Sequence, residues 1–111
     1  MADLAKRFSN NPIITPADIK PSQEGLIVEC VLNPGAFKYQ NKTGLLMRVA
    51  ENAPSTDTTI SVPLLDESAE GGMKILKIDR KDPQLKATDP RVVNYKGDDL
   101  LTTVSHLRLA W

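Results

Sequence analysis

The fold of this chain is decided by the stretch Thr88-Asp89-Pro90-Arg91-Val92-Val93-Asn94-Tyr95-Lys96-Gly97-Asp98-Asp99-Leu100-Leu101. A proline disfavours helical backbone in the residue before it, so we expect Asp89 to be extended. Residues 91–95 are rich in β-branched and aromatic side chains, which predicts a strand. Residues 96–99 have turn composition, and residues 100–109 predict the return strand. The stretch therefore predicts a β-hairpin with a carboxylate, Asp89, at its head.

An earlier stretch repeats this design. Aligning Asn33 with Asp89 also aligns Pro34 with Pro90 and Tyr39 with Tyr95. A weak repeat at this spacing is typical of β-propellers, in which each blade is a small antiparallel sheet around a central channel. The alternative is that two unrelated hairpins share common turn chemistry, because the same turn residues recur in all β proteins.

The remaining segments complete an all-β prediction. Residues 26–32 form a nearly continuous apolar run of strand length, which favours a strand buried on both faces. Further strands are expected at 37–39, 44–50, 58–62 (ended by Pro63) and 73–78, with polar loops at 51–57 and 66–72 and a polar connection at 81–87. We expect residues 1–24 to be irregular, 25–80 to form a first blade and 81–111 to begin a second. Because two blades cannot close a propeller, the chain is expected to be the N-terminal part of a single larger domain.

Composition excludes several classes of protein. The 111 residues are enough for one ordinary domain, with 41% hydrophobic and 25% charged residues. Fourteen basic and fourteen acidic residues cancel, so there is no basic footprint for nucleic acid. No apolar run approaches the length of a membrane span, and the N-terminus lacks the apolar region of a secretory signal. The single cysteine, Cys30, is expected to be a reduced core residue, which favours a cytoplasmic location.

Three polar side chains are candidates for a functional site. Asn33 and Asp89 each stand before a proline at equivalent points of the repeat, so both could face one cavity and bind or protonate a ligand there. Alternatively, both could cap turns, as Asn and Asp commonly do. Arg48 is the one charge in an apolar strand, where it either binds an anion or a sugar hydroxyl in the cavity or faces solvent.

Two other residues are discounted as chemical groups. His106 follows Ser105, but neighbouring strand residues point to opposite faces, so the two cannot form a nucleophile and base pair. A lone histidine cannot make a metal site. Cys30 is too isolated to argue for thiol catalysis.

Four motifs together resemble glycoside hydrolase family 130, which contains β-mannoside phosphorylases and β-mannosidases. They are Asn33-Pro-Gly-Ala36, Leu45-Leu-Met-Arg-Val49, Thr88-Asp-Pro-Arg-Val-Val93 and Ser105-His-Leu-Arg-Leu-Ala110. The resemblance extends from Asn11 to the end of the chain. It implies that the chain forms the first two blades, in part, of a five-bladed β-propeller.

The resemblance also implies roles for four residues. Asp89 matches the general acid of the family, Asn33 matches a residue that binds the sugar in the cleaved position, and Arg48 matches an arginine near the anion and sugar site. Arg91 belongs to the acid's motif and is grouped with the substrate-binding residues, although it is expected to support Asp89 more than to contact the substrate. Thr88 departs from the common pattern, which puts the accepted linkage in question.

The chemistry that the resemblance implies is cleavage of β-mannosidic bonds with inversion, by phosphorolysis or by hydrolysis. The substrate would be a β-mannoside oligosaccharide, with inorganic phosphate as co-substrate of a phosphorylase and no cofactor or metal. The phosphate ligands or the glutamate base would lie downstream of this chain. A non-catalytic carbohydrate-binding or interaction propeller, or an inactive part of the enzyme, is the alternative.

The isolated chain is expected to be inactive and marginally stable. Two blades supply only part of a propeller's active-site wall, so the preorganised electrostatics of the site would be missing. Open sheet edges would leave unpaired backbone groups, which allows association into an oligomer.

Overall fold

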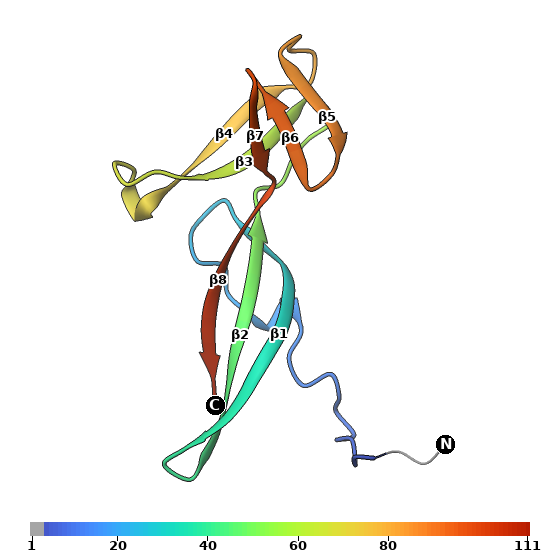
Figure 1. Cartoon of the computed structure of the whole chain (residues 1–111), viewed down its shortest axis with the longest axis vertical. Coiled ribbons are helices and arrows are strands. Elements are labelled where there is room, and N and C mark those ends of the chain that lie inside the picture. Colours follow the sequence, from blue (N-terminus) through green and yellow to red (C-terminus); the bar gives the residue numbers. More distant parts are fainter. Residues whose placement is uncertain (1–3) are drawn as a thin grey trace.

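A computed structural model describes residues 4–111 and contains three small antiparallel sheets (Figure 1). The strands are β1 (Ile27–Tyr39), β2 (Lys42–Asn52), β3 (Thr59–Leu65), β4 (Met73–Asp79), β5 (Leu85–Asp89), β6 (Val92–Tyr95), β7 (Asp98–Leu101) and β8 (Thr103–Ala110). The only helical elements in the described part are two 3-10 turns, η1 (Pro16–Asp18) and η2 (Glu70–Gly72). The all-β prediction is therefore confirmed.

The sheets have the strand orders β1-β2-β8, β3-β4 and β5-β6-β7. Figure 1 shows β1, β2 and β8 running side by side through the lower half of the molecule, with the other two sheets gathered at its upper end. The molecule is elongated, with extents of 54 × 39 × 21 Å. The predicted loop at 66–72 and the strand at 73–78 are confirmed, and β3 continues two residues past Pro63. The proline is tolerated because β3 has no partner on its other edge.

The first hairpin differs from its prediction around Asn33. We expected Asn33 to head a new strand, but β1 runs through it without interruption. Leu32 pairs with Arg48 and Gly35 with Leu46, so β1 carries one extra residue there, which is a β-bulge. Asn33 lies in this bulge with a left-handed backbone, with φ of 46°. Asparagine adopts this conformation more readily than most residues.

The second hairpin turns within the predicted 96–99, but the turn is shorter because β7 begins at Asp98, and the return strand is divided. Lys96 and Gly97 both have positive φ, 53° and 88°, as a two-residue hairpin turn requires. The single strand expected at 100–109 is wrong, because the chain bends at Thr102. There the Thr102 N–H donates to the carbonyl of Arg91 at 3.0 Å, and its hydroxyl donates to the carbonyl of Pro90 at 2.8 Å.

The bend at Thr102 sends β8 away from the second hairpin. β7 stays paired with β6, whereas β8 pairs with β2 from Asn52–Thr103 to Leu45–Ala110. The expected pair of sequential sheets is therefore replaced by three sheets, and the sheet boundaries do not follow the division at residue 80. The two blade assignments, 25–80 and 81–111, stay predictions about a larger fold.

The apolar core lies between the two upper sheets. Its buried members are Ile60, Val62, Ile78 and Val93, with Tyr95 and other half-buried apolar residues packed against them. The prediction that residues 26–32 are buried on both faces is wrong, because β1 is an edge strand with Ile27 48% exposed. Cys30 is a free thiol that is only half buried, so it is not the core residue we expected.

The β1-β2-β8 sheet has two unlike faces. Met47, Val49 and Glu51 alternate along β2 and are buried, and Glu51 accepts a hydrogen bond from Ser22 of the N-terminal segment. The strand register places the exposed side chains of Leu32, Phe37, Leu46, Leu107, Leu109 and Trp111 on the opposite face, together with Arg48. Phe37 and Trp111 make an edge-to-face contact there, with ring centroids 5.7 Å apart.

Candidate functional site

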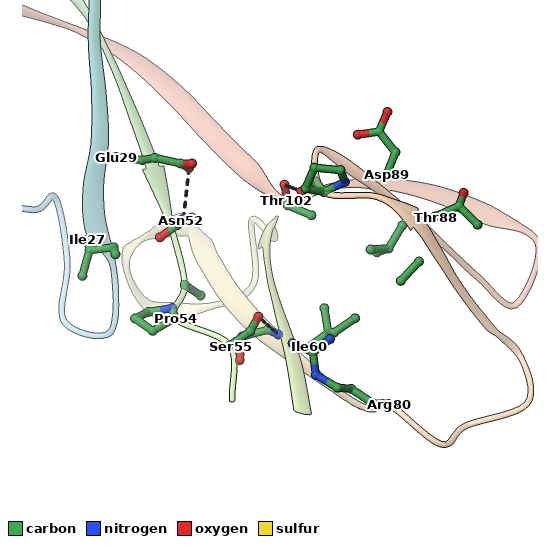
Figure 2. A pocket seen from close by; sticks show the side chains of 15 residues that line it. Ile27, Glu29, Asn52, Pro54, Ser55, Ile60, Arg80, Thr88, Asp89 and Thr102 are labelled. Atoms are coloured by element: carbon green, nitrogen blue, oxygen red, sulfur yellow. Dashed lines mark hydrogen bonds between the residues drawn. The ribbon is translucent and has the colours of Figure 1, made fainter. Parts of the chain in front are cut away.

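A pocket of about 520 Å³ lies where the three sheets meet (Figure 2). Its walls come from the start of β1, the end of β2 and the loop after it, from β3, and from the end of β5 with the bend at Thr102. This volume is within the range of small-molecule binding sites. Asp89 and Thr88 are among the lining residues, so the residue that the sequence singled out lies at the wall of the pocket.

Asp89 ends β5 and is held by Arg91. The Arg91 N–H donates to Oδ1 of Asp89 at 2.8 Å, and the Arg91 guanidinium donates to Oδ2 at 3.1 Å. The hydrogen bonds from the Arg91 side chain, with that from its backbone, hold the pKa of Asp89 below its usual value. Asp89 therefore caps the turn between β5 and β6 and also lines the pocket, so the two alternatives for this residue are compatible. At neutral pH its carboxyl group is ionised.

A second polar group lines the opposite side of the pocket, where Figure 2 shows Glu29 and Asn52 apart from Asp89, Thr88 and Thr102. Asn52 Nδ2 donates to Oε2 of Glu29 at 3.0 Å, which links β1 to the end of β2. The Oδ1 atom of Asn52 is shielded from solvent and has no hydrogen-bond partner within residues 4–111. Sequence reasoning missed both residues. Glu29 is the only charge in the apolar run 26–32, and that was the available signal.

Asn33 and Arg48 lie elsewhere. Both are exposed in the β1-β2 hairpin and neither lines the pocket. They are neighbours across the hairpin, because Leu32, the residue before Asn33, pairs with Arg48. The structure thus forms two separate groups, Asn33 with Arg48 on the sheet and Asp89 with Arg91 at the pocket rim.

A buried polar network joins the N-terminal segment to the β1-β2-β8 sheet. Glu51 is fully buried and accepts hydrogen bonds from the backbone N–H and the hydroxyl of Ser22. Arg108 lies 3.7 Å from the Glu51 carboxylate, donates to the carbonyl of Lys20, and donates to Nε2 of His106 at 2.9 Å. His106 thus has a structural partner in this network. The sequence placed Glu51 in a loop, so its burial was not anticipated.

The part of the chain that the structure describes contains neither a metal-binding cluster nor a membrane-spanning helix. Residues 4–111 bring together no group of three or more His, Cys, Asp or Glu side chains that could hold a metal ion. No helix in the same range is both long and apolar enough to cross a membrane.

No family model matches the chain. A comparison of sequences and a comparison of structures both find similarity to an enzyme of Listeria innocua. The β-1,2-mannobiose phosphorylase of Listeria innocua serovar 6a is 32% identical over 108 residues, which cover 94% of this chain and 30% of the relative. A solved structure of β-1,2-mannobiose phosphorylase from Listeria innocua, in complex with β-1,2-mannobiose, matches with a TM-score of 0.73 and 31% identity, over 94% of this chain and 31% of that one. The chain therefore spans about three tenths of the length of its relative.

Proposed function

We propose that this chain, which belongs to glycoside hydrolase family 130, supplies the general acid and part of the sugar-binding wall of an enzyme that cleaves β-mannosidic bonds. The observation that carries the proposal is the agreement with the Listeria phosphorylase over 94% of the chain in both sequence and fold. The position of Asp89 in a pocket of ligand size supports it.

In the proposed reaction, Asp89 supplies the proton that the glycosidic oxygen takes up, in a phosphorolysis by way of a hydroxyl of the sugar, as the bond to the anomeric carbon breaks. Phosphate or water attacks the anomeric carbon from the opposite face, which inverts its configuration. The products would be a mannose 1-phosphate or a free mannose, and the shortened sugar. Apart from Arg48, the groups that bind phosphate or activate water are proposed to lie in the part of the family fold that this chain does not span.

The pairing of Asp89 with Arg91 limits when Asp89 can act as the general acid. A general acid must carry a proton at the working pH, whereas Arg91 stabilises the ionised form of Asp89. Burial raises the pKa of a carboxyl group. We therefore infer that Asp89 becomes an acid only when bound sugar and the remaining walls exclude water from the pocket. Arg91 would then position the carboxylate and contact no substrate.

Asn33 and Arg48 are proposed to bind substrate at a different point from Asp89. Their exposed places on the β1-β2 hairpin leave both side chains free to contact a sugar or an anion. Arg48 has no ion-pair partner among residues 4–111, which suits a role in binding an anionic group such as phosphate.

The proposal is tested in a chimera in which residues 4–111 replace the matching part of the Listeria phosphorylase. We expect the chimera to release mannose 1-phosphate from β-1,2-mannobiose when phosphate is present. Asp89→Asn should lower the turnover number by at least about 100-fold, because an amide cannot donate the proton. The matched control is Asp66→Asn, since Asp66 is also a hydrogen-bonded carboxylate with a lowered pKa but lies in the loop before η2. Near-normal turnover by the Asp89 variant would reject it as the acid.

A second candidate function is sugar binding without turnover. The ionised state of Asp89 in the isolated chain favours it, because a carboxylate accepts hydrogen bonds from sugar hydroxyls but donates no proton. Retention of the chain on immobilised mannan, with no release of mannose or mannose 1-phosphate by the chimera, would support this function.

A further inference from the structure

We propose that the apolar face of the β1-β2-β8 sheet is a docking surface for the polypeptide that forms the rest of the family fold, whether that polypeptide is joined to this chain or is a separate one. The apolar face consists of the exposed side chains of Leu32, Phe37, Leu46, Leu107, Leu109 and Trp111. The docking does not depend on the catalytic role proposed for Asp89.

The apolar face has the size of a protein interface. The exposed parts of its six side chains are equivalent to about three whole large apolar residues, or roughly 600 Å². That area is at the upper end of the largest apolar patches on monomeric proteins. It also approaches the roughly 800 Å² that each partner contributes to a specific interface. The apolar face can therefore accommodate one partner surface.

The aromatic end of the face is held in place before any partner binds. Phe37 lies across Gly44 of the neighbouring strand, because a Cβ atom added to Gly44 would collide with the Phe37 ring. Trp111 contacts Phe37 edge to face and also lies beside Tyr39, with ring centroids 6.3 Å apart. Side chains that are already ordered lose little freedom on binding, and Trp and Tyr are enriched among the residues that dominate binding energy. This end of the face is therefore expected to anchor the partner.

Charge disfavours a second copy of this chain as the occupant. Residues 32–48 and 107–111 contain four basic side chains and no Asp or Glu. Arg48 lies on the apolar face between Leu32 and Leu107, and the register places Lys42 on the same side of β2. Two copies docked face to face would bring positive charges together without a carboxylate, which is unfavourable. The matching surface is therefore apolar and carries acidic groups.

The relative indicates which polypeptide would fit there. The structural match covers 94% of this chain but only 31% of the Listeria phosphorylase, so most of that enzyme lies outside the matched region. The other face of the β1-β2-β8 sheet is joined to the N-terminal segment by the hydrogen bonds from Ser22 to Glu51. Within residues 4–111 no segment covers the apolar face. The rest of the fold can therefore dock on this side, which would enclose the anion that Arg48 is proposed to bind.

The test compares the isolated 111-residue chain with the chimera in which residues 4–111 replace the matching part of the Listeria phosphorylase. Leu107→Glu places a charge on the apolar face. Leu101→Glu is the matched control, because Leu101 is equally exposed, at 64%, and lies on β7, which is also at the edge of its sheet.

The two variants should differ only in the chimera. In the isolated chain both should unfold within about 0.5 M urea of the wild type, because both side chains are exposed. In the chimera, Leu107→Glu should lower the urea midpoint by at least about 1 M, because it buries a charge in an apolar contact. Leu101→Glu should leave the midpoint of the chimera within about 0.5 M of the unsubstituted chimera.

Equal midpoints for the two chimera variants would overturn the docking surface. A chimera that does not fold without either substitution would also overturn it, because the face would then not accept its partner. Sedimentation of the isolated chain tests the other occupant. A wild-type chain that dimerises at micromolar concentration, and that Leu107→Glu makes monomeric, would overturn the proposal in favour of a second copy.

The release of mannose 1-phosphate separates this inference from the proposed function. A chimera that Leu107→Glu destabilises but that does not cleave β-1,2-mannobiose would support the docking surface and reject the catalytic proposal for this chain. An active chimera that tolerates Leu107→Glu as well as Leu101→Glu would do the reverse.

Discussion

Replacing Glu51 with alanine is expected to lower the free energy of unfolding by about 3 kcal/mol. Glu51 is fully buried, and its carboxylate connects Ser22 of the N-terminal segment with Arg108 of β8. The alanine variant loses these connections and leaves Arg108 without its carboxylate partner. The N-terminal segment should then detach more easily from the sheet.

The magnitude follows from the contacts. Two hydrogen bonds from Ser22 to an ionised acceptor contribute about 1.5–3 kcal/mol each. Part of this is recovered in the variant, because Ser22 is exposed and can bond to water and because no charge remains to be buried. Arg108 is 29% exposed and keeps its bonds to Lys20 and His106, which limits the cost of its lost partner. For a domain of this size, about 3 kcal/mol corresponds to a fall in Tm of roughly 10–20 °C.

The assay is urea unfolding followed by far-ultraviolet circular dichroism and by the fluorescence of Trp111, the single tryptophan. Trp111 follows β8, the strand that carries Arg108, so its signal reports on the same sheet. Glu67→Ala serves as the matched control in an exposed loop and should change stability by less than about 0.5 kcal/mol. Ser22→Ala should be less costly than Glu51→Ala, and the two should be non-additive because they share a contact. An unfolding midpoint for Glu51→Ala equal to that of the control would refute the structural role of this network.

Two further predictions concern the second hairpin and its head. Gly97→Ala should destabilise the chain by about 1 kcal/mol in the same urea assay, because alanine is strained at φ of 88°. The strain comes from the backbone alone, since no atom lies within 4 Å of the added Cβ. Gly35→Ala is the control, and it should be close to neutral because Gly35 has equal space and no positive φ. The pKa of Asp89 should lie below 3.8 by NMR titration and rise in Arg91→Gln. Because the folded pKa is the lower one, the stability from this pair is present above pH 3.8 and is lost as the pH falls through the folded pKa. An Asp89 pKa equal in the two proteins would show that Arg91 does not hold the carboxylate.

Local patterns in the sequence determined the turns and most of the strands. The turn at Lys96 and Gly97 was predictable, because positive φ is a property of the residues in the turn itself. The loop at 66–72 followed from its acidic and glycine-rich composition in the same way. The family was recognisable from three features that occur together at fixed spacing in the sequence. They are the motif around Asp89, the motif around Asn33 and the strand arginine Arg48.

Strand pairing between distant segments was decided only by the tertiary structure. The break at Thr102 has no local signal, because residues 100–109 keep the composition of one strand, yet β7 and β8 join different sheets. That crossover places Arg108 beside Glu51, and so buries a carboxylate that the sequence placed in a loop.

The residues of the candidate site likewise divide into those that the sequence identified and those that only the tertiary structure brought together. The sequence identified Asp89 through its motif, but it placed Asn33 with it and gave no role to Glu29 or Asn52. In the structure, Glu29 and Asn52 line the pocket with Asp89, while Asn33 lies in a bulge of β1 outside it. Residues this far apart in the chain meet only through the packing of three sheets. The side of a strand that faces a pocket changes with a one-residue shift in register, which residue types alone do not specify.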